Sequence, residues 1–139
     1  AGAVERAIEI AKQKGAKRAV LLNVSAPFHC RLMQPAAEAM ESALGDTEIR
    51  APNLPVVSNV TAYALESPDE IRNRLCEQVV QPVRWRESVE YMRDKGVERL
   101  YEIGHGKVLS GLAKRIDRKL TGMPVGTPGD VETFLNELA

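Results

Sequence analysis

One histidine stands where an α/β enzyme would carry a general base. Residues 25–35 read SAPFHCRLMQP; they follow the apolar residues 19–22, and Pro35 opens an alanine-rich segment. The pattern predicts a buried strand, a loop that bears His29, and then a helix. An imidazole on such a loop can exchange protons near neutral pH, because histidine ordinarily has a pKa of about 6.5. From these residues alone, a loop histidine that caps the next helix is the simpler interpretation.

The composition excludes several classes of protein. With 139 residues the chain is long enough for one domain with a core, and its 19 basic and 19 acidic residues balance. A neutral balance gives no reason to expect binding to nucleic acid or an anionic membrane, and no apolar run approaches the roughly 20 residues of a membrane span. Cys30 and Cys76 lack metal-site spacing and suit a reducing cytoplasm. We therefore expect a cytoplasmic protein without metal or cofactor, and the start at Ala1 suggests an excised fragment.

Hydrophobic periodicity and turn residues predict the elements that would position the histidine loop. Helices are expected over residues 3–14, 35–44, 68–81, 86–95, 108–120 and 131–138. Strands are expected over residues 19–23, 56–60 and 99–103, and residues 121–129 look like a connector rich in glycine and proline. Alternating strands and helices indicate an α/β domain with a largely parallel sheet. Three strands are few for a complete sheet of this kind.

Several segments together resemble one enzyme family, the malonyl-CoA:acyl carrier protein transacylases. They occur in the family's order at residues 3–22, 24–37, 55–60 (PVVSNV), 78–92 (with QPVRW) and 101–116 (with YEIGHGKVLSGL). The resemblance implies an α/β fold, with residues 24–139 as the C-terminal part of an α/β-hydrolase-like acyltransferase domain. Residues 1–23 would be the last helix and strand of an inserted ferredoxin-like subdomain.

The resemblance also implies an activity. Such an enzyme moves a malonyl group from malonyl-CoA through an acyl-serine intermediate to the phosphopantetheine thiol of acyl carrier protein, and so supplies fatty acid synthesis. The family's Gly-x-Ser-x-Gly elbow and its carboxylate-binding arginine match nothing in this sequence. We therefore expect the missing N-terminal part of the same enzyme as a partner, and no activity from this chain alone. The alternative is a non-catalytic carrier-protein-binding or assembly module with the same fold.

Three residues match the family's catalytic positions or lie beside them. His29 matches the general base, and Gln78 matches the residue whose main-chain carbonyl fixes the tautomer of that base, so that its side chain should matter little. Phe28 accompanies malonyl selectivity in related domains, because a ring beside the acyl group leaves no room for an α-methyl branch. The alternatives are a solvated helix end for Gln78 and a core aromatic for Phe28.

Four further residues are weaker candidates. Ser25 and Asn59 are expected to line the same substrate cleft. Lys17 and Arg18 form a basic cluster that could contact the acidic carrier protein or the coenzyme A phosphates, although solvated charges at a helix end explain them equally well. The second histidine, His105, is expected at the surface.

Overall fold

The computed structural model describes residues 2–138. The helices are α1 (Gly2–Gln13), α2 (Gln34–Gly45), α3 (Pro68–Glu77), α4 (Trp85–Asp94), α5 (Val108–Ile116) and α6 (Pro128–Leu138), with a 3-10 turn η1 (Arg31–Met33) before α2. The strands are β1 (Val56–Val57), β2 (Ala64–Leu65), β3 (Arg99–Ile103) and β4 (Thr121–Val125). Helices and strands alternate over the second half of the chain, as expected of an α/β protein.

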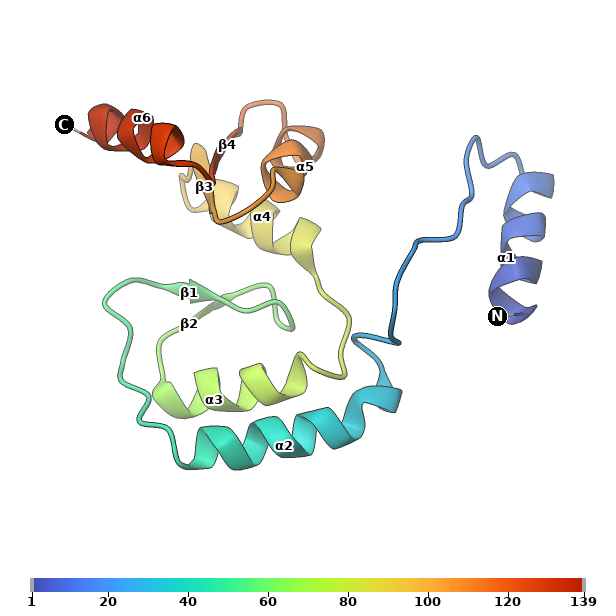
Figure 1. Ribbon diagram of the computed structural model, residues 1–139, viewed down its shortest axis with the longest axis horizontal. Coiled ribbons are helices and arrows are strands. Elements are labelled where there is room, and N and C mark those ends of the chain that lie inside the picture. Colours follow the sequence, from blue (N-terminus) through green and yellow to red (C-terminus); the bar gives the residue numbers. More distant parts are fainter. Residues whose placement is uncertain (1, 139) are drawn as a thin grey trace.

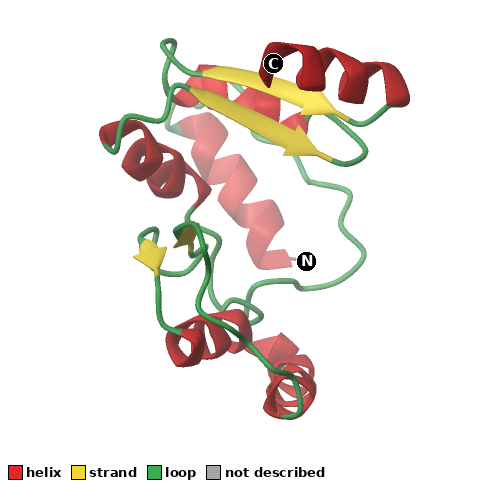
Figure 2. Cartoon of the chain, turned by 90° about the vertical axis from the view of Figure 1, so that its left-hand side faces the viewer, coloured by secondary structure: helices red, strands yellow, loops and turns green. Residues whose placement is uncertain are grey.

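The strands form two separate pairs. β3 and β4 are parallel, with Arg99 opposite Thr121 and Ile103 opposite Val125, and α5 connects them. β1 and β2 form a short antiparallel hairpin. In Figure 1 the hairpin lies above α2 and α3, which run side by side, whereas α4, α5 and α6 surround β3 and β4. Figure 2 shows β3 and β4 edge to edge with α6 beside them. The described strands therefore form one parallel pair and one antiparallel pair, and not the single, largely parallel sheet that was expected.

Small and branched side chains form the core. The apolar residues that the structure buries are Ala37, Ala62, Leu65, Val89, Ala113, Leu120 and Val125. Val89 on α4 and Ala113 on α5 are fully buried, so each of these two helices packs against the core through a small side chain. Small side chains let the backbone of a helix come close to a neighbouring element. The backbone of α5 comes close to that of β4 in this way.

Gly122 of β4 lies directly against the backbone of α5. A Cβ atom at this position would lie 2.7 Å from the Cα of Ser110, a distance that real side chains do not reach. The obstacle is main chain, which cannot rotate away as a side chain would. The connection β3–α5–β4 therefore depends on a glycine here.

We expect Gly122→Ala to lower the free energy of unfolding by about 1–3 kcal/mol, the usual cost of overpacking. Gly111→Ala on α5 is the matched control, because nothing beyond the adjacent residues and backbone of its own helix lies within 4 Å of the added methyl group. Alanine at this helical position should raise the free energy of unfolding by about 0.5–1 kcal/mol. Urea unfolding of both variants measures the difference, and equal stabilities would show that α5 can shift away from β4.

The strand expected over residues 19–23 is absent. The segment is extended but hydrogen-bonds to no other strand among residues 2–138, and Leu22 is 77% exposed. Its apolar run indicated burial, but a strand forms only where a neighbour satisfies its backbone groups. In Figure 1 this segment and α1 stand apart from the remaining elements.

Other boundaries also differ from expectation. β4 lies within the expected connector. It was not expected as a strand because it contains Gly122 and Pro124, and glycine and proline are uncommon in strands. The strand expected over residues 56–60 stops at Val57, and β2 was not expected. Helix α3 ends at Glu77 rather than near residue 81, and α5 ends at Ile116, before the buried Leu120.

None of the helices described between residues 2 and 138 combines the length and the apolar character that crossing a bilayer requires. Within the same range, no three His, Cys, Asp or Glu side chains gather as a metal site would need.

Candidate active site

His29 lies on a loop of tight turns between the extended segment and η1. The Phe28 amide donates to the carbonyl of Ala26 at 2.9 Å, and the Cys30 thiol donates to the carbonyl of Pro27 at 3.1 Å. His29 itself has a φ of 56°, in the left-handed region that residues with a Cβ rarely adopt. Such a conformation costs about 1–3 kcal/mol, and strained residues of this kind cluster at functional sites. The loop therefore presents the imidazole from an unusual backbone conformation.

The imidazole is bonded to the end of α3. His29 Nδ1 lies 2.8 Å from the main-chain oxygen of Gln78, which is 49 residues further along the chain. The structure thus brings together the two residues that were expected to work as a pair.

The carbonyl of Gln78 is available because of the residues that follow it. In a continuing helix this oxygen would accept the N–H of residue 82, but Pro82 has none. The chain instead tightens into a turn, in which the amides of Val80 and Gln81 both donate to the carbonyl of Glu77. Among residues 2–138 no backbone amide donates to the oxygen of Gln78, and the imidazole of His29 is hydrogen-bonded to it instead.

This contact fixes the chemistry of the ring. A carbonyl oxygen only accepts, so the hydrogen of neutral His29 must be on Nδ1. Nε2 then carries the lone pair and can remove a proton from a hydroxyl or thiol. The main-chain carbonyl accepts from Nδ1, the ring atom that donates to a carboxylate in a catalytic triad. His29 is exposed, so Nε2 is accessible from outside this chain.

Asn59 lies against the same helix end, on the tight loop between β1 and β2. Its amide nitrogen donates to the side-chain oxygen of Gln78 at 3.2 Å. Its main-chain oxygen accepts the amide of Arg84 at 2.9 Å. Asn59 therefore connects the hydrogen-bonded residues His29 and Gln78 to the start of α4, and the sequence did not indicate this connection.

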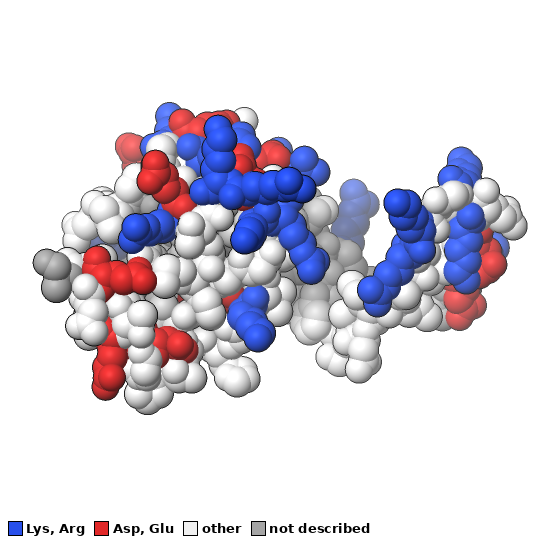
Figure 3. Space-filling view, turned by 90° about the horizontal axis from the view of Figure 1, so that it is seen from above, with Lys and Arg blue, Asp and Glu red and all other residues white. Residues whose placement is uncertain are grey.

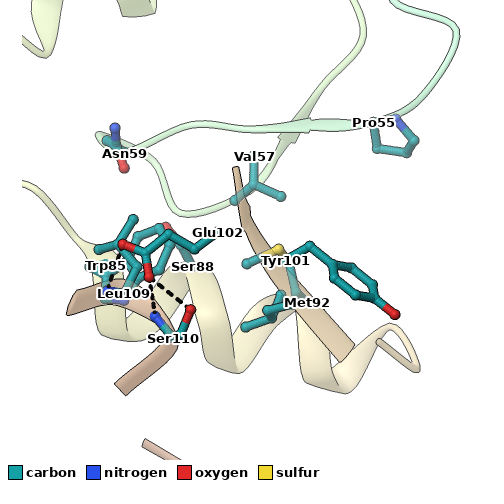
Figure 4. Close-up of a pocket in the computed structure, with 11 residues that line it drawn as sticks. Pro55, Val57, Asn59, Trp85, Ser88, Met92, Tyr101, Glu102, Leu109 and Ser110 are labelled. Carbon is teal, nitrogen blue, oxygen red and sulfur yellow. Dashed lines mark hydrogen bonds between the residues drawn. The ribbon is translucent and has the colours of Figure 1, made fainter. Parts of the chain in front are cut away.

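A cavity of about 320 Å³ opens beside Asn59 between the hairpin, α4 and β3. Its lining is mostly apolar, and Figure 4 shows Trp85, Ser88, Glu102 and Ser110 around it. His29 and Gln78 are not among the lining residues. The indole nitrogen of Trp85 is buried and has no hydrogen-bond partner among residues 2–138.

Glu102 is the ionised group of this cavity, and the sequence did not single it out. Its carboxylate accepts the amide of Ser110 at 2.8 Å, the hydroxyl of Ser110 at 2.7 Å and the amide of Leu109 at 3.2 Å. The hydrogen bonds from Ser110 hold the pKa of Glu102 below its ordinary value. Glu102 thus binds the amides at the beginning of α5 that lack helical partners. Ser110, with its hydroxyl committed to Glu102, is not poised as a nucleophile.

The remaining candidates lie outside this cavity. Phe28 is 56% exposed within this chain, and Ser25 is exposed on the same loop. His105 is exposed, as expected. Lys17 and Arg18 are exposed after α1, and Figure 3 shows basic and acidic side chains together at that end of the molecule.

Comparison with solved structures assigns the class of protein. The structure resembles an acyl-carrier-protein-S-malonyltransferase from Bartonella henselae with a TM-score of 0.91 and 51% identity, over 99% of this chain and 44% of that one. A type II PKS acyl-carrier protein in complex with its malonyl-transacylase gives 0.89 and 44% identity, over 98% and 44%. The fold is that of part of an α/β acyltransferase.

Sequence comparison gives the particular family. The malonyl CoA-acyl carrier protein transacylase of Escherichia coli K12 is 49% identical over 133 residues, which are 96% of this chain and 43% of that enzyme. The Bacillus subtilis enzyme is 44% identical over 135 residues, or 97% and 43%. No protein-family profile matches the chain. The chain is thus related along nearly its whole length to these transacylases and spans about 43% of theirs, which confirms the resemblance.

Proposed function

We propose that this chain is the part of a malonyl-CoA:acyl carrier protein transacylase that bears the general base. The hydrogen bond from His29 to the carbonyl of Gln78 carries the proposal, because it leaves Nε2 free to accept a proton. The names of the relatives favour an enzyme over a non-catalytic assembly module. The catalytic serine would come from the missing N-terminal part of the same enzyme.

The first half of the proposed reaction loads the enzyme. The serine hydroxyl attacks the thioester carbonyl of malonyl-CoA while Nε2 of His29 takes its proton. The carbon–sulfur bond breaks, the coenzyme A sulfur leaves with that proton, and a malonyl-serine ester remains. The Nδ1 hydrogen stays on the ring and remains hydrogen-bonded to the carbonyl of Gln78 throughout, so the imidazole returns to the same tautomer.

The second half repeats the proton transfer with a different nucleophile. Nε2 removes the proton of the phosphopantetheine thiol of acyl carrier protein, and the sulfur attacks the malonyl-serine ester. The serine oxygen leaves and recovers the proton from His29. One residue serves both halves because a neutral imidazole can accept and return a proton at the same atom.

Exposed residues around His29 suit the substrates of this reaction. Phe28 and Ser25 share its loop and would lie beside the acyl group. Lys17 and Arg18 would face the carrier protein or the coenzyme A phosphates. The exposed segment that contains them stands apart with α1, which supports assigning residues 1–23 to the small ferredoxin-like subdomain.

The two cysteines bear on the setting of the enzyme. Cys30 and Cys76 are both free thiols, which suits the reducing cytoplasm where fatty acid synthesis would consume its product. Residues 24–139 would form the C-terminal part of the large α/β-hydrolase-like domain.

The direct test measures both halves of the reaction in the complete enzyme. Mass spectrometry should detect a malonyl adduct on a serine after mixing with malonyl-CoA, and the adduct should disappear when holo acyl carrier protein is added. An enzyme that forms no adduct and transfers no malonyl group would contradict the proposal.

Phe28→Ser in the complete enzyme should relax selectivity toward methylmalonyl-CoA. Loss of the ring opens space beside the acyl group, and the fit of one methyl group is worth about 1–3 kcal/mol, or about 10–200-fold in discrimination. The ratio of kcat/KM values for the two thioesters, measured in competition, gives the effect. Phe134→Ser is the control, because Phe134 packs against Tyr101 rather than beside His29. An unchanged ratio in Phe28→Ser would show that the ring does not contact the acyl group.

A further inference from the structure

The side chain of Gln78 is hydrogen-bonded as well as its main chain. Its oxygen accepts the amide nitrogen of Asn59 at 3.2 Å while its carbonyl accepts Nδ1 of His29 at 2.8 Å. Both Asn59 and Gln78 are half-buried. Three residues from three separate segments are therefore linked in one line, from the loop between β1 and β2 through the end of α3 to the histidine loop.

The loop that presents Asn59 is built to stay in place. The buried hydroxyl of Ser58 accepts the amides of Val60 at 3.1 Å and Thr61 at 3.4 Å, and the amide of Ala62 donates to the carbonyl of Ser58 at 2.9 Å. Ala62 has a φ of 61°. Among residues 2–138, it and His29 are the two non-glycine residues with a left-handed backbone. The two strained loops meet at Gln78.

Arg84 ties this loop to α4 from the other side. Its amide donates to the carbonyl of Asn59 at 2.9 Å, and its guanidinium donates to the carbonyl of Thr61 at 3.1 Å. The carbonyl of Arg84 in turn accepts the hydroxyl of the buried Ser88 at 2.9 Å. Asn59 is thereby anchored to α4, which carries the buried Ser88 and Val89, and its side chain reaches from there to Gln78 in the turn after α3.

The geometry points to Asn59 as a positioning residue for the general base, acting through Gln78 and not by binding substrate. This inference rests on the proposed function of His29. The amide nitrogen of Asn59 is engaged by Gln78, and Figure 4 shows it directed away from the other residues that line the cavity. The bond restrains the turn after α3, which sets the direction of the Gln78 carbonyl and hence the plane and tautomer of the imidazole.

The inference changes the expectation for the side chain of Gln78. If only its carbonyl mattered, Gln78→Ala would be mild. If the bond to Asn59 orients that carbonyl, then Gln78→Ala and Asn59→Ala should lower the activity to a similar extent. Outer partners of functional histidines typically contribute about 10–100-fold to activity, and we expect about 10-fold here because the carbonyl itself remains.

The test is a double-mutant cycle in the complete enzyme, with steady-state kinetics for malonyl-CoA. Asn59→Ala, Gln78→Ala and the double variant should each lower kcat by about 10-fold, with KM unchanged within about twofold, because residues that act as a unit are not additive. Asn53→Ala and Gln81→Ala are the matched controls, since both residues are exposed. Asn59→Asp should retain most of the activity, because the amide of Gln78 can turn and donate to the carboxylate.

A second readout separates positioning from a general loss of stability. Nitrogen-15 NMR of the imidazole, assigned with His29→Gln, reports which ring nitrogen carries the hydrogen. We expect the Nδ1–H form to dominate in the parent enzyme and to lose population in Asn59→Ala and Gln78→Ala. Thermal unfolding identifies any variant that does not fold, and Asn59→Asp then serves as the folded comparison.

Three results would overturn the inference: a higher KM with unchanged kcat in Asn59→Ala, additive losses in the double variant, or an unchanged tautomer in the two alanine variants. The first would make Asn59 a substrate contact. Failure of the proposed function looks different, because His29→Ala would then retain full transfer whatever Asn59 does.

Discussion

Replacing His29 by alanine in the complete enzyme is expected to lower kcat/KM for malonyl transfer by about 10²–10⁴-fold, the usual contribution of a general base. Loss of the imidazole removes the Nε2 lone pair, which the bond from Nδ1 to Gln78 leaves free. Both halves of the proposed reaction would use this atom, so enzyme loading and transfer to acyl carrier protein should slow together. Single-turnover measurements of each half give the two effects separately.

His105→Ala is the matched control for this substitution. His105 is exposed on the turn before α5, and no hydrogen bond joins it to His29 or Gln78 within the described residues. We expect its kcat/KM to stay within about twofold of the parent enzyme, as for most surface substitutions. If His105→Ala were the severely impaired variant, the general base would have been assigned to the wrong loop. If only one half of the reaction slowed in His29→Ala, a second base would have to serve the other half.

The helices and β3 were largely predictable because their signals are local. Periodic apolar residues and flanking glycine residues placed α1, α2 and α4 to within two residues, and β3 at its observed bounds. β4 was not predictable in this way, since it contains Gly122 and Pro124, and glycine and proline are depleted in strands. The structure explains the glycine: it is required by the approach of α5, a contact that no local pattern reveals.

The histidine site was predictable only in part. Residues 25–35 indicated a loop histidine, but the pairing with Gln78 came from a family resemblance and not from any spacing. One local signal was available, because Pro82 cannot donate to the carbonyl four residues before it and so leaves that oxygen free. The bond between Asn59 and Gln78 had no such signal. It arises from a hairpin loop whose position depends on Ala62 and Arg84.

The 139-residue chain on its own is expected to transfer no malonyl group above the uncatalysed background. No serine among residues 2–138 is hydrogen-bonded to His29, and the hydroxyl of Ser110 is bound to Glu102. A base without its nucleophile retains little activity, because the members of such a pair act as a unit. The assay is transfer of labelled malonyl from malonyl-CoA to holo acyl carrier protein, with the complete enzyme as the positive control.

Supplying the rest of the enzyme as a separate polypeptide should restore activity that depends on His29. The isolated chain exposes Leu21 and Leu22, and within residues 2–138 β3 has a neighbouring strand on one side only. Apolar surface and an open sheet edge of this kind favour association with a complementary partner. Restored activity should be lost again when the added partner is combined with His29→Ala. Robust transfer by the isolated chain would instead mean that a residue of this chain acts as the nucleophile, and the division of the reaction between two parts of one enzyme would be wrong.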